Sequence, residues 1–336
     1  MTASDRYADV TTLASRTMRQ LPPAGCVFLR RAYLRGSVQA AVMRQTGGPE
    51  ILTLEDVQRP EPGDGEVLVR VRAASVNPVD WKYRRGLLPM PLPAVLGRDV
   101  SGTVEVSRAE GYVSGEDVFG IAASGGYAEF ATAAAAAIAK KPPSVSHEQA
   151  AAIPVAGLTA WQALFDRGSL KRGQTALIAG AAGGVGHFAV QFAHHKGARV
   201  IGTGSSRNRE LVLELGADEY VDYTQQDVAT ATSGVDVALD TVGGETTGSL
   251  LPTLRQGGIL VTIAGAPPEQ AARERGVRAE LLIMSPSPDE LARIAELVAA
   301  NVIRVHIAQV LPLGQVRQAH ELSESGHARG KIILRP

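Results

Sequence analysis

A glycine-dense turn between a strand-like run and a helical pattern constrains this chain more than any other feature. The segment Gln174 to Gly186 is first apolar and then rich in glycine, and a helical pattern follows it. A pyrophosphate-binding βα turn has this order, with Gly183 letting the backbone approach the phosphates and Gly186 letting the helix pack closely. The first position of the fingerprint is Ala181 instead of glycine. The segment therefore predicts a doubly wound parallel sheet that binds a dinucleotide.

The end of the next strand-like run indicates which dinucleotide binds. Ala198 to Gly204 reads as the second strand. An NAD site places a carboxylate there, about 20 residues after the first fingerprint position. This chain has Ser205, Arg207 and Arg209 instead. A hydroxyl and guanidinium groups can bind a 2′-phosphate, which a carboxylate would repel. The sequence predicts NADPH over NADH, and the alternative is that the arginines are solvated residues that open a helix.

Composition excludes several classes of protein. The chain has 336 residues, of which 45% are hydrophobic and 20% charged, as in a soluble chain with two domains. Its net charge is zero, so nothing indicates a nucleic-acid or anionic-membrane partner. No apolar run reaches the roughly 18 residues of a membrane span. The single cysteine, Cys26, excludes an internal disulfide framework and a zinc site of several thiolates, and it fits a reducing cytoplasm.

The first residues differ in character from the rest of the chain. Met1 to Gly36 has scattered arginines, no sustained period and no apolar signal region. We predict that residues 1–36 are a disordered extension, or an over-long gene start with Val38 as the true initiator. A targeting sequence is the other alternative. Strand-like patterning begins abruptly at Gln39 to Met43.

A β-rich pattern then gives way to alternating strands and helices. Glu66 to Arg72 alternates apolar and polar residues, as a half-buried strand does. The pattern becomes helical between Gly157 and Phe165. Further predicted strands are Val100 to Val106, Asp117 to Ile121, Ala128 to Thr132, Val235 to Asp240 and Gly258 to Ile263, and further predicted helices are Arg209 to Leu215 and Leu291 to Ala300. The alanine run 133–137 reads as a surface connection or strand.

Ordered landmarks carry a family resemblance from about residue 38 to the C-terminus. They are Gly47-Gly-Pro-Glu50, Pro62-Gly-Asp-Gly-Glu-Val-Leu-Val69, Val76-Asn-Pro-Val-Asp80, Leu96-Gly-Arg-Asp-Val-Ser-Gly102, Gly125-Gly-Tyr-Ala-Glu129, Ala156-Gly-Leu-Thr-Ala160, Ala181-Ala-Gly-Gly-Val-Gly186, Leu215-Gly-Ala-Asp218, Asp240-Thr-Val-Gly-Gly244 and Ser325-Gly-His-Ala-Arg-Gly-Lys-Ile332. With these landmarks the chain resembles the medium-chain dehydrogenase/reductase superfamily, in its zinc-independent NADPH:quinone oxidoreductase branch. Alanine in the first position of the glycine turn is this branch's own form.

The resemblance implies an α/β fold in which a Rossmann doubly wound parallel sheet is inserted into a β-rich, GroES-like domain. We expect residues 37–156 and 305–336 to form the GroES-like substrate domain, and residues 157–304 to form the NADPH-binding domain. The strand-like tail Gly330 to Leu334 would then return to the first domain.

The same resemblance argues against a metal. Zinc-dependent relatives carry an early cysteine and a Gly-His-Glu, where this chain has Val76 to Asp80 and Gly97-Arg98-Asp99. Catalytic zinc needs three suitable protein ligands. His194 and His195 are neighbours on a predicted helix and point in different directions, so we interpret them as surface or packing residues.

The resemblance implies hydride transfer from NADPH to a quinone or to the β-carbon of an α,β-unsaturated carbonyl. The residues that would bind the cofactor are Thr159, Gly183, Gly184, Val185, Ser205, Arg207, Tyr223 and Lys331, and those of the catalytic loop are Asn77, Asp80 and Tyr83. No spacing argument singles out Tyr83.

Several of these residues also have purely structural interpretations. Thr159 would serve as a helix-capping hydroxyl. Asn77 and Asp80 would be turn formers in an Asn-Pro segment. Lys331 would be an exposed lysine on an edge strand.

Three functions remain open at this point. The first is an NADPH-dependent quinone or enone reductase in the cytoplasm, acting on a small molecule as a homodimer formed by extension of the nucleotide-domain sheet. The second is an enoyl-thioester reductase, which has the same fold and hydride chemistry. The third is a non-catalytic NADPH-binding protein with a sensor or structural role.

Overall fold

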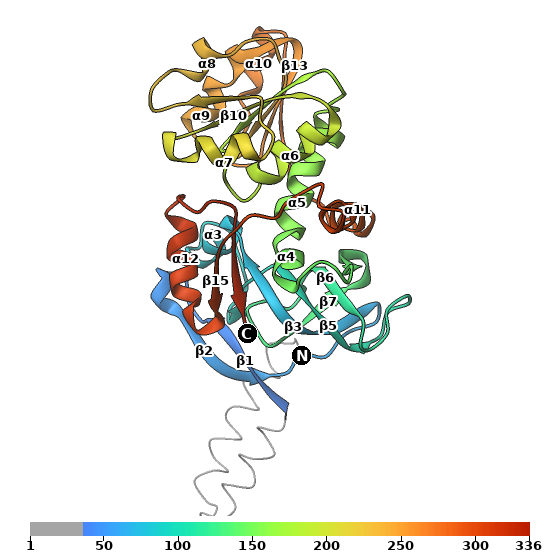
Figure 1. The fold of residues 1–336 in the computed structure, drawn as a ribbon. Coiled ribbons are helices and arrows are strands. Elements are labelled where there is room, and N and C mark those ends of the chain that lie inside the picture. Colours follow the sequence, from blue (N-terminus) through green and yellow to red (C-terminus); the bar gives the residue numbers. More distant parts are fainter. Residues whose placement is uncertain (1–35) are drawn as a thin grey trace, which may run out of the picture.

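The computed structural model describes residues 36–336, in which a β-rich domain and a nucleotide-type α/β domain are joined by helix α5 (Pro154–Trp161) (Figure 1). The extension predicted for residues 1–36 lies outside the described residues, apart from Gly36. The fold is the predicted one, an α/β chain with a parallel sheet beside a GroES-like domain. No helix in the described part of the chain is long and apolar enough to cross a membrane.

The β-rich domain contains two sheets. The larger sheet runs in the order β15 (Ile307–Pro312), β16 (Lys331–Arg335), β3 (Glu66–Val76), β5 (Asp99–Ser107), β6 (Asp117–Ile121) and β8 (Ile138–Lys140), with β7 (Phe130–Ala134) also paired to β3. The smaller sheet runs in the order β2 (Leu52–Gln58), β1 (Ser37–Met43) and β4 (Ala94–Val95). The alanine run is partly the end of β7 and partly a 3₁₀ turn at 135–137.

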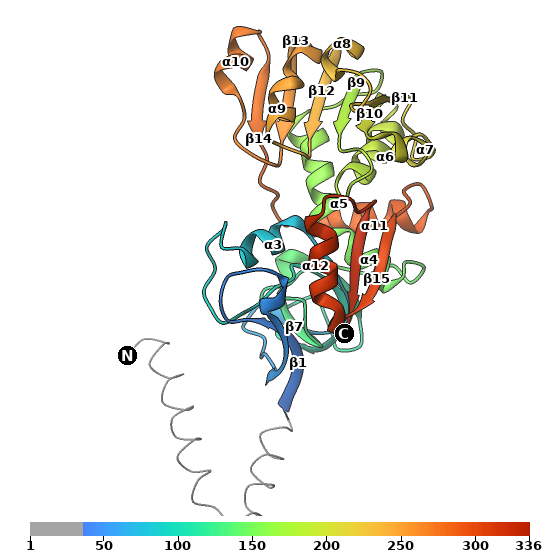
Figure 2. The ribbon, with the colours of Figure 1, turned by 90° about the vertical axis from the view of Figure 1, so that its left-hand side faces the viewer.

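The C-terminal strand returns to this first domain, as predicted. β16 pairs antiparallel with β3, with Ile333 opposite Ser75. On its other side β16 pairs parallel with β15. Figure 2 shows these two strands beside α12 in the β-rich domain. Residues separated by most of the chain therefore meet on neighbouring strands.

The second domain has a six-stranded sheet in which every pair is parallel. The order is β11 (Glu219–Asp222), β10 (Arg199–Gly204), β9 (Thr175–Ala179), β12 (Val235–Asp240), β13 (Leu254–Thr262) and β14 (Arg278–Leu281). In chain order this is 3-2-1-4-5-6, the doubly wound order that binds dinucleotides where the strand order reverses. That reversal lies between β9 and β12.

Strand β9 shows why both faces of this sheet are covered. Its side chains alternate between the faces. Ile178 packs in one apolar cluster with Phe188 and Phe192, while Leu177 packs in another with Leu250. A parallel strand that is buried on both sides needs a continuous apolar run, which the sequence of β9 supplies.

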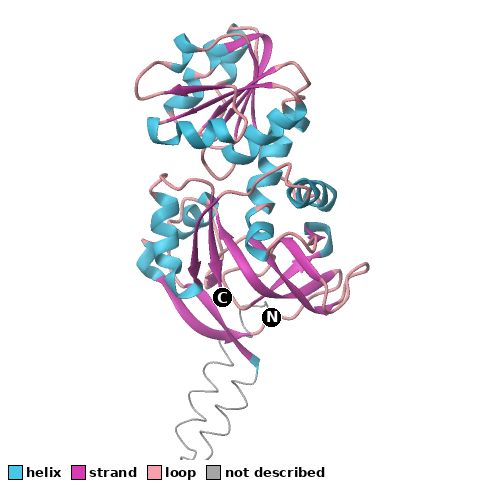
Figure 3. Ribbon diagram, viewed as in Figure 1, coloured by secondary structure: helices cyan, strands magenta, loops and turns pink. Residues whose placement is uncertain are grey.

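Helices surround the sheet of the nucleotide domain and cover parts of the β-rich domain (Figure 3). The helices are α3 (Pro78–Arg84), α4 (His147–Ala152), α5, α6 (Gly186–Lys196), α7 (Arg209–Glu214), α8 (Val228–Ala231), α9 (Glu245–Ser249), α10 (Glu269–Glu274), α11 (Pro288–Ala299) and α12 (Val316–Glu324). Shorter turns are η2 (Pro49–Ile51), η3 (Ala135–Ala137), η5 (Ser206–Asn208), η6 (Leu251–Thr253) and η7 (Leu313–Gln315), and α5 continues into a π-helical turn, η4 (Gln162–Arg167).

Candidate functional site

The glycine turn lies between β9 and α6, where the sequence places it. Gly183 donates its N–H to the carbonyl of Gly180 at 2.9 Å, and Val185 is the N-cap residue of α6. A Cβ on Gly186 would lie 2.2 Å from the Gly180 oxygen, so only glycine allows the helix to approach the strand this closely. The turn has the close backbone packing and the helix N-terminus that fit a dinucleotide pyrophosphate.

A buried histidine supports this turn from inside. The Nδ1 of His187 is 3.0 Å from the carbonyl oxygen of Gly183, and the side chain is fully buried. Burial lowers the pKa of His187 to about 3. The ring is therefore neutral near pH 7, and Nδ1 is the nitrogen that donates to Gly183. No sequence motif pointed to His187.

Next to the turn, three buried polar side chains of the β-rich domain bind one another. The ammonium of Lys331 donates to Asn77 Oδ1 at 2.5 Å and lies 3.5 Å from Asp99 Oδ2. The Asn77 amide donates to the same Asp99 oxygen at 2.8 Å. Asp99 and Lys331 have side-chain exposures of 0% and 2%. Asn77 is therefore held in one orientation, with its oxygen toward the lysine and its NH₂ group toward the carboxylate.

Asp80 and Tyr127 extend this cluster. Asp80 Oδ2 accepts hydrogen bonds of 2.8 Å from the Asn77 backbone N–H and from the Tyr127 hydroxyl. Burial raises the pKa of Asp80 to about 6, against the lowering effect of these two donors. Burial, with the nearby Asp80 charge, also raises the pKa of Tyr127 well above its usual value, which keeps its hydroxyl a hydrogen-bond donor.

In the ion pair of Lys331 with Asp99, burial and the charge of the partner shift each pKa in opposite directions. Burial lowers the pKa of Lys331, and the Asp99 and Asp80 charges oppose that change. Burial likewise raises the pKa of Asp99, while Lys331 and the Asn77 amide lower it. Each charge favours the ionised form of the other, so removal of either partner leaves a buried charge uncompensated.

Lys331 also connects the cluster to the glycine turn. Its neighbour Gly330 donates a backbone N–H to Ala182 O at 2.8 Å. A Cβ built on Gly184 would lie 3.3 Å from Cδ of Lys331. The predicted pyrophosphate turn and the predicted catalytic loop therefore lie on either side of one lysine. The interpretation of Lys331 as an exposed edge-strand residue is wrong, because β15 covers the outer side of β16.

Two other predicted residues have different surroundings. Thr159 lies inside α5 and donates to Val155 O at 2.6 Å, so it does not cap the helix. The backbone N–H of Val155 in turn donates to Asp99 Oδ1 at 3.0 Å, which brings this helix turn to the cluster. Tyr83 packs against the apolar core of the β-rich domain. The hydroxyl that binds Asp80 belongs to Tyr127 instead.

The residues predicted for the adenosine end lie together at the end of β10. The Tyr220 hydroxyl donates to Ser205 O at 2.6 Å, and the Tyr223 N–H donates to Gly204 O at 3.2 Å. Arg207 is exposed, and Tyr223 is 60% exposed. No carboxylate occupies positions 204 to 209.

The polar cluster does not have the donor set of a zinc site. Within residues 36–336 no group of three or more His, Cys, Asp or Glu side chains is arranged to hold a metal. Within the two segments that the sequence aligns with the zinc ligands of relatives, Asn77 and Asp99 bind each other and the Lys331 ammonium, and Arg98 stands at the histidine of Gly-His-Glu. Catalytic zinc needs three nitrogen, sulfur or free carboxylate ligands, so these residues do not fit the metal.

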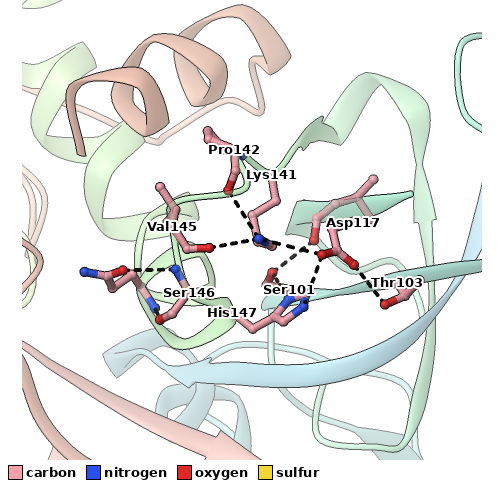
Figure 4. Close-up of polar contacts among 10 residues, drawn as sticks. Ser101, Thr103, Asp117, Lys141, Pro142, Val145, Ser146 and His147 are labelled. Atoms are coloured by element: carbon pink, nitrogen blue, oxygen red, sulfur yellow. Dashed lines mark hydrogen bonds and ion pairs between the residues drawn. The ribbon is translucent and has the colours of Figure 1, made fainter. Parts of the chain in front are cut away.

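Figure 4 shows a second polar cluster, formed by β5, the start of β6 and the start of α4. Ser101 Oγ is 2.9 Å from His147 Nδ1, and His147 Nε2 is 3.6 Å from Asp117 Oδ2. This is the residue order of a hydrolase triad. However, buried Ser101 donates its hydroxyl hydrogen to Val118 O at 3.0 Å. The imidazole must then donate to the serine, so the arrangement does not activate a nucleophile.

Sequence reasoning missed part of the first cluster. The sequence points to Asp99 only as the residue that replaces the glutamate of Gly-His-Glu, and to Tyr127 only as part of the landmark Gly125-Gly-Tyr-Ala-Glu129. The signal that could have found Asp99 is its alignment with the glutamate of Gly-His-Glu, which is a zinc-ligand segment in relatives. The role of Tyr127 depends on a contact across 47 residues, which no local pattern indicates.

Two family models and many known proteins match this chain. Residues 63–143 match the alcohol dehydrogenase GroES-like domain, and residues 215–334 match the family described as zinc-binding dehydrogenase. A chloroplast envelope quinone oxidoreductase homolog of Arabidopsis thaliana is 34% identical over 90% of this chain and 100% of its own length. The chain belongs to the medium-chain dehydrogenase/reductase superfamily, in its quinone oxidoreductase-like branch.

Solved structures place it in the same branch. The quinone oxidoreductase of Coxiella burnetii has a TM-score of 0.86 and 34% identity, covering 89% of this chain and 99% of that chain. A mycobacterial protein complexed with NADPH has a TM-score of 0.82 and 33% identity, covering 89% of this chain and 100% of that chain. The matches extend over nearly the whole of each relative, so they cover both domains of this chain.

Proposed function

We propose that this medium-chain reductase transfers a hydride from NADPH to a quinone or an α,β-unsaturated carbonyl without a metal. The observation that carries the proposal is the position of Lys331, which contacts the glycine turn on one side and binds Asn77 and Asp99 on the other. A cofactor on that turn would extend toward the polar cluster. The similarity to quinone oxidoreductases supports the acceptor class.

Residues at the end of β10 support NADPH as the cofactor. Ser205 and Arg207 stand where an NAD site has its carboxylate, and Tyr223 lies beside them. We propose that Ser205 and Arg207 bind the 2′-phosphate, that Tyr223 contacts the adenosine, and that Gly183, Gly184 and Val185 contact the pyrophosphate. The NADPH complex of the mycobacterial relative supports the same choice.

When bound, NADPH supplies the hydride, and the protein supplies position and electrostatics. Asn77 uses one amide hydrogen for Asp99, which leaves the second to donate to an acceptor oxygen that gains negative charge. The adjacent Lys331 ammonium favours that charge. We propose that Asn77 and Lys331 polarise the acceptor, and that Asp80 and Tyr127 hold Asn77 in place. Thr159, on the helix turn that binds Asp99, would face the nicotinamide end.

The loop after α3 suits an apolar acceptor. Leu87 is 65% exposed and Leu92 is 41% exposed, both within the segment 86–93 that follows the catalytic loop. Quinone and enone rings are largely apolar, and we propose that these two side chains contribute to the acceptor site.

We also propose that the protein is a cytoplasmic homodimer joined through β14. This strand is an edge of the six-stranded sheet, so its outer backbone groups have no neighbouring strand in that sheet. Beside it, Leu281 and Ile283 are 43% and 78% exposed. Ile283→Asp should halve the molar mass measured by sedimentation if two copies pair at this edge, and an unchanged dimer mass would contradict this interface.

The activity can be tested with purified, EDTA-treated protein and a panel of quinones and enones, with NADPH and NADH in parallel. We expect oxidation of NADPH with at least one acceptor, much weaker use of NADH and no loss on chelation. Loss of activity with EDTA would contradict the metal-free mechanism. Turnover of an enoyl thioester in preference to quinones would move the function to an enoyl-thioester reductase, and tight NADPH binding with no turnover would indicate a non-catalytic protein.

A further inference from the structure

Three arginines gather at the end of β10 without acidic partners. Arg207 lies in η5, Arg209 opens α7, and Arg329 comes from the segment before β16. Each guanidinium donates to a backbone carbonyl: Arg207 to His327, Arg209 to Tyr220, and Arg329 to Arg207. In the described part of the chain none of the three forms an ion pair with a carboxylate. The hydrogen-bond partners of these three positive charges are backbone carbonyl oxygens, which carry partial negative charges, so the group is suited to bind an anion.

Arg329 belongs to the other domain. Its Nη2 donates to Arg207 O at 2.7 Å, while Arg207 Nη2 lies 3.4 Å from His327 O, two residues before Arg329. The two segments therefore bind each other across the domain boundary through two reciprocal contacts, each from an arginine side chain to a backbone carbonyl. Arg209 is less available, because its guanidinium stacks 5.8 Å from the Tyr220 ring centre.

We propose that Arg329 is a second specificity residue for the 2′-phosphate, forming with Arg207 a clamp that takes one arginine from each domain. This inference rests on the proposed use of NADPH. A guanidinium carries five N–H donors, and Arg329 uses one nitrogen for the Arg207 carbonyl, so its remaining donors can bind a phosphate oxygen. A ligand without the 2′-phosphate has no group for Arg329 to bind.

The position of Arg329 in the chain would also connect 2′-phosphate binding to the polar cluster at the nicotinamide end of the site. Gly330 binds the glycine turn through Ala182 O, and Lys331 binds Asn77 and Asp99. Three consecutive residues thus contact the adenosine end, the pyrophosphate turn and the catalytic cluster. A phosphate held by Arg329 would fix the backbone from which the Lys331 side chain extends.

Calorimetric titration with 2′,5′-ADP and with 5′-AMP isolates the 2′-phosphate and needs no acceptor substrate. We expect the wild-type protein to bind 2′,5′-ADP more tightly than 5′-AMP. Arg329→Ala should weaken 2′,5′-ADP binding about tenfold, since a hydrogen bond to a charged group is lost, and leave 5′-AMP binding unchanged. Arg329→Gln keeps a donor for the Arg207 carbonyl but removes the charge, and should behave like Arg329→Ala. Arg273→Ala, at a 70% exposed arginine on α10, is the control for loss of one surface charge.

The outcomes separate the two proposals. If the wild-type protein prefers 2′,5′-ADP and Arg329→Ala keeps that preference, the role of Arg329 is overturned and the NADPH proposal stands. If Arg329→Ala weakens both ligands equally, or Arg329→Gln restores wild-type binding, the residue only holds the loop. If the wild-type protein does not prefer 2′,5′-ADP, both proposals fail. Hydrogen exchange supplies a second readout: 2′,5′-ADP, but not 5′-AMP, should protect residues 325–331 in the wild-type protein and not in Arg329→Ala.

Discussion

Lys331 and Lys141 are both buried lysines of the β-rich domain, but their ammonium groups have different partners. Lys331 binds Asn77 and faces Asp99, whose side chain is fully buried. Lys141 donates to the carbonyls of Pro142 and Val145 at 3.2 and 2.8 Å, and its nearest carboxylate, Asp117, is 40% exposed at 3.7 Å (Figure 4). The side chains themselves are similarly buried, with exposures of 2% and 6%.

The difference indicates what each lysine does. The Lys141 ammonium is bound by two backbone carbonyls of its own loop and lies near the partly hydrated Asp117 carboxylate. Because water screens this ion pair, the burial of the Lys141 charge costs little free energy. The Lys331 charge lies near the buried carboxylates of Asp99 and Asp80 and beside the glycine turn, where desolvation is expensive and electrostatic effects on a reacting group would be strong. Burial alone therefore does not separate the catalytic role that we propose for Lys331 from a structural role, and the kind of partner is what differs between the two lysines.

The largest effect is expected from Lys331→Met. We predict a loss of about a hundredfold in kcat/KM with NADPH and a quinone, because the charge that favours the acceptor oxyanion is removed. We also predict a fall of about 3–5 kcal/mol in the free energy of unfolding, because Asp99 keeps an uncompensated buried charge. Steady-state kinetics and urea unfolding measure the two effects.

A double variant separates these two effects. Asp99→Asn with Lys331→Met removes both charges, so most of the lost stability should return while the activity stays low. If the double variant recovers activity together with stability, the role of Lys331 is structural, as that of Lys141 is.

The next largest effect concerns the pH dependence of stability. The pKa of Asp80 is about 6 in the folded protein, against an ordinary value of 3.8. Between these values the folded state holds a proton that the unfolded state has lost, so stability falls as the pH rises through this window, by about 3 kcal/mol. Asp80→Asn should lessen this slope in urea unfolding between pH 4 and 7, and the part that remains includes the contribution of Asp99, whose pKa burial also raises. An identical slope in the variant would show that Asp80 does not titrate there.

Lys141→Met should have a smaller effect, confined to stability. Its two carbonyl partners lose a charged donor, which costs about 1–3 kcal/mol in unfolding free energy. We expect kcat/KM to stay within about twofold of the wild-type value, since among the described residues the hydrogen bonds and ion pairs of this cluster involve neither the glycine turn nor Asn77. A large loss of activity in a folded Lys141→Met protein would break the comparison.

The smallest effect is a pH slope of opposite sign at the second cluster. Burial lowers the pKa of His147 from 6.5 in the folded protein, although Asp117 opposes this. As the pH falls through 6.5 the unfolded state takes up a proton before the folded state does, so stability is complete above pH 6.5 and decreases below it. His147→Asn should lessen that decrease in thermal unfolding between pH 7 and 5. A steeper decrease in the variant would contradict the sign.

Local patterns predicted the fold well. The strands Val235–Asp240 and Asp117–Ile121 have the predicted bounds, and the glycine turn lies between the predicted strand and helix. These features depend on side-chain period and on glycine chemistry within about ten residues, which a sequence displays directly. The start of α5 was missed because Pro154 occupies its first turn, three residues before the predicted helical segment, and this places Thr159 inside the helix.

The candidate site was predicted only in part, because its contacts are not local. Asn77 and Asp80 are three residues apart, and their link through the first turn of α3 is readable as a capping pattern. Lys331 meets Asn77 across 254 residues, through the pairing of β16 with β3. Only the three-dimensional arrangement shows that Asp99 completes the cluster and that Arg329 reaches Arg207.

The most direct test of the central claim is the initial rate of NADPH oxidation with a simple para-quinone, measured for the wild-type, Lys331→Met and Lys141→Met proteins at one pH and after EDTA treatment. We predict turnover by the wild-type and Lys141→Met proteins and a loss of about a hundredfold for Lys331→Met alone. A folded Lys331→Met protein with the wild-type rate would contradict the assignment of Lys331 to the catalytic centre.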